Sequence, residues 1–371
     1  MTARARALDR LRRILAPAGG GVPLFSTGKA AQQAVQRGLY GVSDDAAVAR
    51  AHTDRLAALP GARVVLLGVP TDTGAGFVRG ANQAPLAIRA HALSRGAPLG
   101  PDPGLVDAGD VRVVPHLLAD DMLSDEQVRA CRAALYGDPQ APLPVAPLDM
   151  ARAALDDVRV LAPEAVPIVL GGDHSVGWPA FAAAFEHARR TGRRVGLLHF
   201  DAHTDLLPHR LGVRICFATW AYHANELLER DGRLVQVGIR ASGRDRAHWE
   251  GTLGVRQYWA DEVAGRPVEA IVAEIVERFE ARGVDRVYVS NDIDGTDPAF
   301  AAATGTPEPG GLAPEQVRGI TRGVLARFPL CGADLVEVAP PLAHEAAGEP
   351  DRTLATALAY LSDLVTAATA G

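Results

Sequence analysis

Short apolar runs alternate with longer amphipathic segments from about residue 62 to the end of the sequence. Runs of β-branched and aliphatic residues are typical of strands buried on both faces, and the segments between them have the spacing of crossover helices. This alternation predicts one three-layer α/β/α domain with a doubly wound, mainly parallel sheet. The expected strands are residues 63–67, 166–170, 195–200, 234–239, 286–290 and 334–338, and the expected helices include 268–282, 314–327, 353–367 and one that starts at a capping box at 124–127.

The first 57 residues have a different character, because they are rich in Ala and Arg and are interrupted by three glycines at 19–21. We predict a helical N-terminal extension over residues 1–57, which could contribute to subunit contacts, and a second, larger domain over residues 58–371. The beginning of the chain has the spacing of a short amphipathic helix rather than of an export signal.

Composition excludes several classes of protein. The 371 residues carry a formal net charge of −6, and the basic residues are scattered, which argues against a nucleic-acid surface. No apolar run approaches the length of about 18 residues that a membrane span needs, so no membrane partner is expected. Cys131, Cys216 and Cys331 are widely separated, so neither a disulfide framework nor a structural zinc site is indicated, and a cytoplasmic location is expected.

Acidic and histidine residues follow three of the predicted strands. The first strand end carries GGDHS at 171–175, the second DAHTD at 201–205, and the third NDID at 291–294. The carboxyl ends of parallel strands meet at one edge of the sheet, so these segments can converge there. Residues two apart in an extended chain share a face, which allows both residues of each D-x-H or D-x-D pair to point into one cavity.

Together these segments supply two imidazoles and four carboxylates, which would repel one another unless cations neutralised them. Two divalent ions would balance the charge, and oxygen-rich donors with few imidazoles suit Mn²⁺, although Ni²⁺ fits the same set. Two such ions can lower the pKa of a shared water towards neutrality and make hydroxide, the predicted nucleophile. The candidate metal ligands are His174, Asp201, His203, Asp205, Asp292 and Asp294.

Each motif alone has a simpler explanation. A single Asp after a strand is usually a helix cap or a turn residue, and the glycines of GGDHS are compatible with a tight turn that leaves His174 as an interior histidine. Three such clusters, each directly after an apolar strand, favour a metal site over three separate turns.

The three clusters resemble those of the ureohydrolases, the family of arginase, agmatinase and formimidoylglutamase. The resemblance rests on GGDHS, DAHTD and SNDIDGTDP at 290–298, and continues through TGTPEPGGL at 304–312 and DLVEVAP at 334–340. It includes GVPTDTGAGFVRGANQAPLAIR at 68–89 and spans residues 62 to about 366. The resemblance implies an enzyme that holds two metal ions, hydrolyses a guanidinium compound and releases urea.

The resemblance also implies roles for individual residues. One ion would be held by His174, Asp201, Asp205 and Asp292, and the other by Asp201, His203, Asp292 and Asp294. Glu337 would face the guanidinium, where a carboxylate can accept paired N–H bonds. A structural pairing of Glu337 with an Arg inside the sheet is the alternative.

One position departs from the family pattern. Arginases and agmatinases have a histidine, thought to carry protons, some ten residues after DAHxD, and here Cys216 or its neighbours align with it. His209 and His223 are the nearby substitutes. The candidate catalytic residues are therefore Asp205, Glu337, His209 and His223.

The segments PTDTGAGFVRGAN, CFATWA and SNDIDGTDP most resemble bacterial guanidine hydrolases, which are associated with nickel. Bulky residues at 217–222, with Trp249 and Trp259, would leave room only for a small substrate, although they are equally compatible with a core or a subunit contact. We predict that free guanidine is converted to urea and ammonia, with agmatinase, guanidinobutyrase and formimidoylglutamase activities as alternatives. The candidate substrate-binding residues, besides Glu337, are Thr71, Thr73, Thr219 and Trp220.

Two other classes remain open. A single-zinc deacetylase shares this type of fold, although His174 and Asp294 argue for two ions. A family member without catalytic activity is compatible with the missing histidine. The resemblance implies a homo-oligomer, a trimer or a hexamer.

Overall fold

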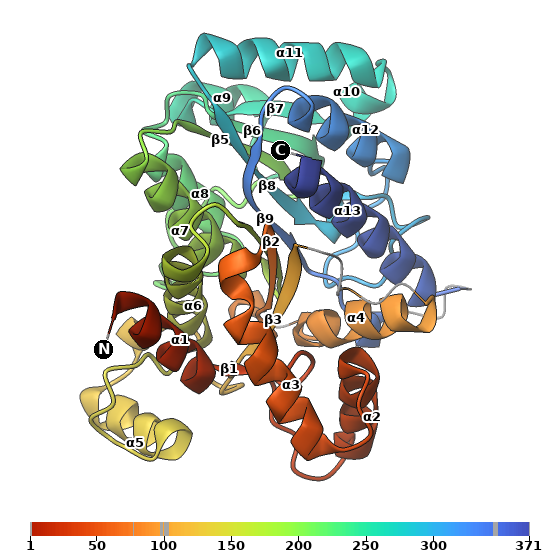
Figure 1. Cartoon of the computed structure of the whole chain (residues 1–371). Helices are drawn as coiled ribbons and strands as arrows, with labels where there is room; N and C mark the ends of the chain where they lie inside the picture. The colour runs from red at the N-terminus through yellow and green to blue at the C-terminus, as the bar shows by residue number, and fades with distance from the viewer. Residues whose placement is uncertain (1, 77, 97–98, 100–103, 344–347, 371) are drawn as a thin grey trace.

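The computed structural model describes residues 2–76, 78–96, 99, 104–343 and 348–370, so Phe77 of the segment 68–89 lies outside the described residues. Its centre is a nine-stranded sheet in the order β1-β3-β2-β4-β9-β8-β5-β6-β7, in which every pair is parallel except β1 with β3 (Figure 1). The strands are β1 (Leu15–Ala16), β2 (Val64–Gly68), β3 (Leu105–Val111), β4 (Val166–Leu170), β5 (Val195–Phe200), β6 (Leu234–Ile239), β7 (Arg256–Trp259), β8 (Arg286–Asp292) and β9 (Leu330–Val336).

Helices cover both faces of the sheet, and alternate residues of the strands point into two separate cores (Figure 1). Within β2, for example, Val65 and Leu67 pack in one core and Val64 and Leu66 in the other. The predicted three-layer α/β/α class is therefore confirmed. One face is covered by α1 (Ala3–Ile14), α6 (Pro147–Leu161), α7 (Gly177–Arg190), α8 (Trp220–Leu227) and α9 (Arg246–Leu253), and the other by α4 (Ala84–Ser94), α10 (Ala260–Ala264), α11 (Val268–Ala281), α12 (Pro314–Leu325) and α13 (Asp351–Ala370).

Three strands were not predicted from the sequence, and one prediction was displaced. Strand β3 contains two aspartates and a glycine, which are depleted in strands, but Asp107 and Asp110 are stabilised there by the buried Arg89. Strands β1 and β7 are too short to give a clear pattern. Strand β9 begins at Leu330 and ends before Glu337, whose φ of +60° turns the chain out of the sheet.

The first 57 residues form α1, β1, α2 (Lys29–Tyr40) and α3 (Asp45–Ala57), and β1 adds an antiparallel edge to the sheet. The backbone N–H groups of Gly19 and Gly21 donate to Asp110 Oδ2, at 2.9 and 3.3 Å. This region therefore packs directly on the larger α/β unit, while the domain division at residue 57 stays a prediction.

The expected absence of any segment with the length and apolarity of a membrane span needs one correction. Among the described residues, α13 is long and apolar enough by length and composition alone. Leu354, Leu361 and Leu364 of this helix are nevertheless buried in the core beside the sheet, and Asp363 pairs with Arg318 of α12. The helix is thus part of the packed domain. The predicted capping box before α5 (Asp125–Tyr136) is present, and the three cysteines are free.

Candidate metal centre

The predicted metal ligands and Glu337 lie at or just after the ends of four strands that are neighbours in the sheet, β4, β9, β8 and β5. The turn after β4 allows no side chain at Gly172, because a Cβ atom there would lie 1.6 Å from the carbonyl oxygen of Thr71. The same carbonyl accepts the N–H of Asp173 at 2.9 Å, and the Gly172 carbonyl accepts the N–H of Glu337 at 2.8 Å. The glycines of GGDHS therefore let three loops meet at the carboxyl edge of the sheet.

The first group of side chains surrounds His174. Its Nδ1 atom lies 3.2 Å from Asp201 Oδ2, 3.2 Å from Asp205 Oδ2 and 3.0 Å from Asp292 Oδ2. All four side chains are buried. His174 Nδ1 makes no hydrogen bond of good geometry among the described residues, although three carboxylate oxygens surround it. A divalent cation fits this donor set.

The second group surrounds His203, whose Nδ1 atom lies 3.1 Å from Asp294 Oδ2 and 3.5 Å from Asp201 Oδ1. The two oxygens of Asp201 thus face different histidines. Thr306 donates to Asp294 Oδ2 at 3.1 Å, and Glu308 lies 3.8 Å from His203 Nε2. The structure therefore brings all six predicted ligands into two adjoining groups that share Asp201.

Burial and neighbouring charges shift the pKa values of the carboxyl groups in this cluster. Burial, with repulsion from Asp294 and Asp201, raises the pKa of Asp292 well above its usual value. Burial also opposes ionisation of Asp201, yet the histidines around it, His174, His199 and His203, hold the pKa of Asp201 well below its usual value. Bound cations would relieve this repulsion.

A second set of buried groups orients His174, and the sequence interpretation did not identify it. His174 Nε2 lies 2.9 Å from Ser290 Oγ, and Ser290 donates to Asp334 Oδ1 at 2.7 Å. Tyr288 donates to the other oxygen of Asp334 at 2.7 Å. Hydrogen bonds to the remote ring nitrogen fix the orientation of ligating histidines. The D-x-H alternation of the second cluster also extends back to His199, whose Nε2 atom lies 2.9 Å from Asp201 Oδ2.

Trp220 and Thr219, predicted to bind substrate, make other contacts. The Trp220 indole is fully buried, donates to Asp205 Oδ2 at 3.0 Å and lies 4.5 Å from the His174 ring, centroid to centroid. Asp205 has a φ of +52°, a conformation that surrounding contacts must maintain. Thr219 is also fully buried, and its Oγ1 atom donates to the carbonyl oxygen of Arg214 at 2.8 Å. Trp220 therefore supports a predicted metal ligand.

Glu337 follows β9 beside the first group. Its Oε1 atom accepts the backbone N–H of His174 at 2.9 Å, and its side chain is only 8% exposed. Burial, with repulsion from Asp173, raises the pKa of Glu337 well above its usual value. The alternative pairing with a structural Arg is not seen for Glu337 among the described residues. A buried carboxyl group in need of a cationic partner is suited to a guanidinium.

The candidates for proton transfer lie on or near the loop after Asp205. His209 is exposed on this loop, and Cys216 is buried. The Nε2 atom of His223 lies 3.1 Å from the carbonyl oxygens of Pro208 and Arg214. Burial lowers the pKa of His223. The Nε2 atom of His223 therefore contacts the loop and none of the predicted metal ligands.

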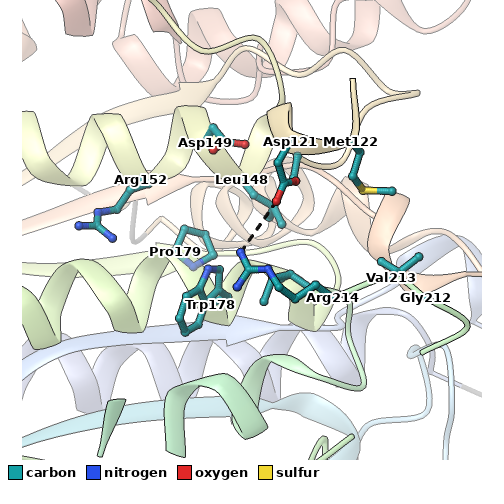
Figure 2. A pocket seen from close by; sticks show the side chains of 12 residues that line it. Asp121, Met122, Leu148, Asp149, Arg152, Trp178, Pro179, Gly212, Val213 and Arg214 are labelled. Carbon is teal, nitrogen blue, oxygen red and sulfur yellow. Dashed lines mark ion pairs between the residues drawn. The ribbon is translucent and has the colours of Figure 1, made fainter. Parts of the chain in front are cut away.

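A pocket of about 450 Å³ lies beside the same loop (Figure 2). In it the Arg214 guanidinium points towards Asp121, at 3.9 Å, and lies 5.9 Å from the ring centroid of Trp178. The His223 ring meets Trp178 edge-on at 5.7 Å. None of the predicted ligands lines this pocket, so it is distinct from the metal centre.

Thr71 and Thr73 differ in their surroundings. Thr71 is buried, and its Oγ1 atom has no hydrogen-bond partner among the described residues. Thr73 donates to the carbonyl oxygen of Pro115 at 3.1 Å. Of the two, Thr71 retains a hydroxyl that is available to a ligand.

An α/β/α fold with histidines and carboxylates gathered at the carboxyl edge of its sheet is the arrangement expected of a metal-dependent hydrolase. The family model described as the arginase family matches residues 62–365. The guanidinobutyrase of Pseudomonas aeruginosa is 33% identical over 301 residues, covering 78% of this chain and 83% of the relative. The mitochondrial agmatinase of Gallus gallus is 34% identical over 292 residues, covering 76% and 75%.

Among solved structures, proclavaminate amidino hydrolase from Streptomyces clavuligerus aligns with a TM-score of 0.66 and 30% identity, covering 84% of this chain and 93% of the other. The chain belongs to the arginase family. It is a hydrolase of the ureohydrolase type, which acts on C–N bonds of guanidino compounds. The predicted family and enzyme class are thus confirmed.

Proposed function

We propose that the protein hydrolyses free guanidine to urea and ammonia. The observation that carries the proposal is the buried Glu337 carboxylate, beside which Gly305 contributes no side chain. A Cβ atom on Gly305 would lie 3.8 Å from Glu337 Oε2 and 3.6 Å from Val78 Cγ1, so the place that such a side chain would fill can receive a compact planar cation.

In this proposal His174, Asp201, Asp205 and Asp292 would hold one divalent ion, and Asp201, His203, Asp292 and Asp294 the other, as Ni²⁺ or Mn²⁺. Bound ions of this kind activate water as a nucleophile near neutral pH. The Glu337 carboxylate would accept N–H bonds from the guanidinium and orient its carbon, and Thr71 Oγ1 would accept a further N–H bond. His209 and His223 remain candidates for carrying the proton to the departing ammonia.

A guanidino acid is the second candidate substrate, because one cavity could receive a tail. The cavity measures about 380 Å³ and is lined by Thr73, Cys216, Phe217 and Arg210, among others. The Arg210 guanidinium lies 4.8 Å from the ring centroid of Phe217 and would pair with the carboxylate of such a substrate. The relatives named guanidinobutyrase and guanidinopropionase fit this alternative.

A substrate panel tests the two candidates. Urea release should be measured with guanidine, agmatine, 4-guanidinobutyrate and arginine, each with Ni²⁺ and with Mn²⁺. The proposal expects the highest kcat/KM with guanidine, and turnover confined to a long-chain compound would refute it. Arg210→Leu should reduce activity only if a guanidino acid is the substrate, with Arg214→Leu on the same loop as the matched control.

A further inference from the structure

A row of polar side chains crosses three strands behind the metal centre. His199 of β5, Gln236 of β6 and Gln257 of β7 are register partners across neighbouring strands, and all three are fully buried. Burying an amide in a sheet between two apolar cores is unfavourable unless its hydrogen-bonding groups are satisfied. Packing alone therefore does not account for three buried polar residues in neighbouring strands.

The hydrogen bonds of this row all run in one donor-to-acceptor direction, which Trp259 at the outer end determines. The Trp259 indole can only donate, and it donates to Gln257 Oε1 at 3.0 Å. The Gln257 amide must then present its nitrogen to Gln236 Oε1, at 2.9 Å, and Gln236 presents its own nitrogen to His199 Nδ1, at 3.0 Å. The proton of a neutral His199 ring therefore lies on Nε2, which faces Asp201 Oδ2.

Gln236 makes one more contact at the site. Its Nε2 atom also donates to the carbonyl oxygen of Thr204, at 2.7 Å. Thr204 lies between His203 and Asp205, so the same amide holds both the partner of Asp201 and the loop that carries two more predicted ligands. The two N–H groups of the Gln236 amide thus donate to His199 and to the carbonyl oxygen of Thr204, both of which adjoin predicted metal ligands.

We propose that Gln236, Gln257 and Trp259 are positioning residues that orient His199 and, through it, Asp201, the residue shared by the two ligand groups. The inference rests on the ligand role of Asp201 in the proposed function. Groups that orient metal ligands from behind typically change metal affinity by about 10–100-fold when they are removed. The effect should decrease along the row with distance from Asp201.

The test compares Gln236→Met, Gln257→Met and Trp259→Phe with Trp249→Phe. Trp249 is the matched control, because its indole donates to Ser242 Oγ at 2.9 Å outside the row. Calorimetric titration with Mn²⁺ or Ni²⁺ should show affinity falling about 10–100-fold for Gln236→Met, less for Gln257→Met and least for Trp259→Phe. Trp249→Phe should bind as the unchanged protein does.

A spectroscopic measurement separates positioning from simple stabilisation. In ¹⁵N spectra of metal-free, histidine-labelled protein, His199 should be protonated at Nε2, and Gln236→Met should shift the Nδ1 resonance because that atom loses its donor. Variants that melt earlier without metal yet keep the affinity and the resonance would overturn the proposal. If the unchanged protein binds no divalent ion, the proposed function fails, whereas the His199 signature is still measurable.

Discussion

The two ligand groups of the metal centre differ in how firmly the protein holds them. The His174 group is buried throughout, with Ser290 behind the ring and the Trp220 indole on Asp205. In the other group the His203 side chain is 29% exposed, and its outer nitrogen faces Glu308, which is 40% exposed. One group is thus buried throughout, while in the other the His203 imidazole reaches solvent beside the buried Asp201 and Asp294.

This difference indicates where substrate and exchanging ions approach. A buried ligand set surrounded by satisfied partners keeps its geometry without an ion, whereas a half-exposed imidazole can adjust. We therefore expect the His174 group to bind its ion more tightly and the His203 group to lose its ion first.

Asp292→Ala should abolish the asymmetry by disabling both groups. One oxygen of Asp292 faces His174, and the other accepts the backbone N–H of Asp294 at 2.9 Å. Urea release should become undetectable, and metal analysis should find both ions lost. Retention of two tightly bound ions would contradict the ligand assignment.

Glu337→Gln should leave both groups intact and remove the carboxylate that faces the substrate. We expect kcat/KM to fall by about 10²–10³-fold, as when one preorganised electrostatic contact to a reacting group is lost. Metal content, measured on the same sample, should stay at the wild-type level. A loss of metal in this variant would mean that Glu337 acts on the ions instead.

Trp220→Phe sharpens the comparison, because it removes one hydrogen bond from the buried group alone. Metal affinity should fall by about 10-fold or more, since Asp205 loses the donor that holds its strained conformation. Chelator titration should then release both ions together rather than in two steps. Thr306→Val removes the corresponding bond to Asp294 and should instead widen the interval between the steps.

Glu308→Gln should have the smallest effect, because both partners are partly exposed and their charged atoms lie 3.8 Å apart. Exposed pairs contribute little, so metal affinity and kcat/KM should each change by less than about fivefold. A larger change would show that the exposed group is held as firmly as the buried one.

Much of the fold and the ligand set could be predicted from local patterns. Strands with long apolar runs, such as β4, β5 and β8, and helices with clear apolar spacing, such as α11 and α12, were identified correctly. Strand β3 was not predicted, because its aspartates are stabilised by Arg89, which lies on a helix earlier in the chain. The bond of Trp220 to Asp205 was not predicted, because it depends on a turn that sequence spacing does not reveal.

The types of residue at the strand ends could be read from local patterns, because side chains alternate along a strand and parallel strands finish at one edge of the sheet. Which partners lie behind those residues depends on the three-dimensional fold. The contacts of His174 with Ser290 and of His199 with Gln236 join distant segments, so they depend on strand order and register rather than on spacing along the chain.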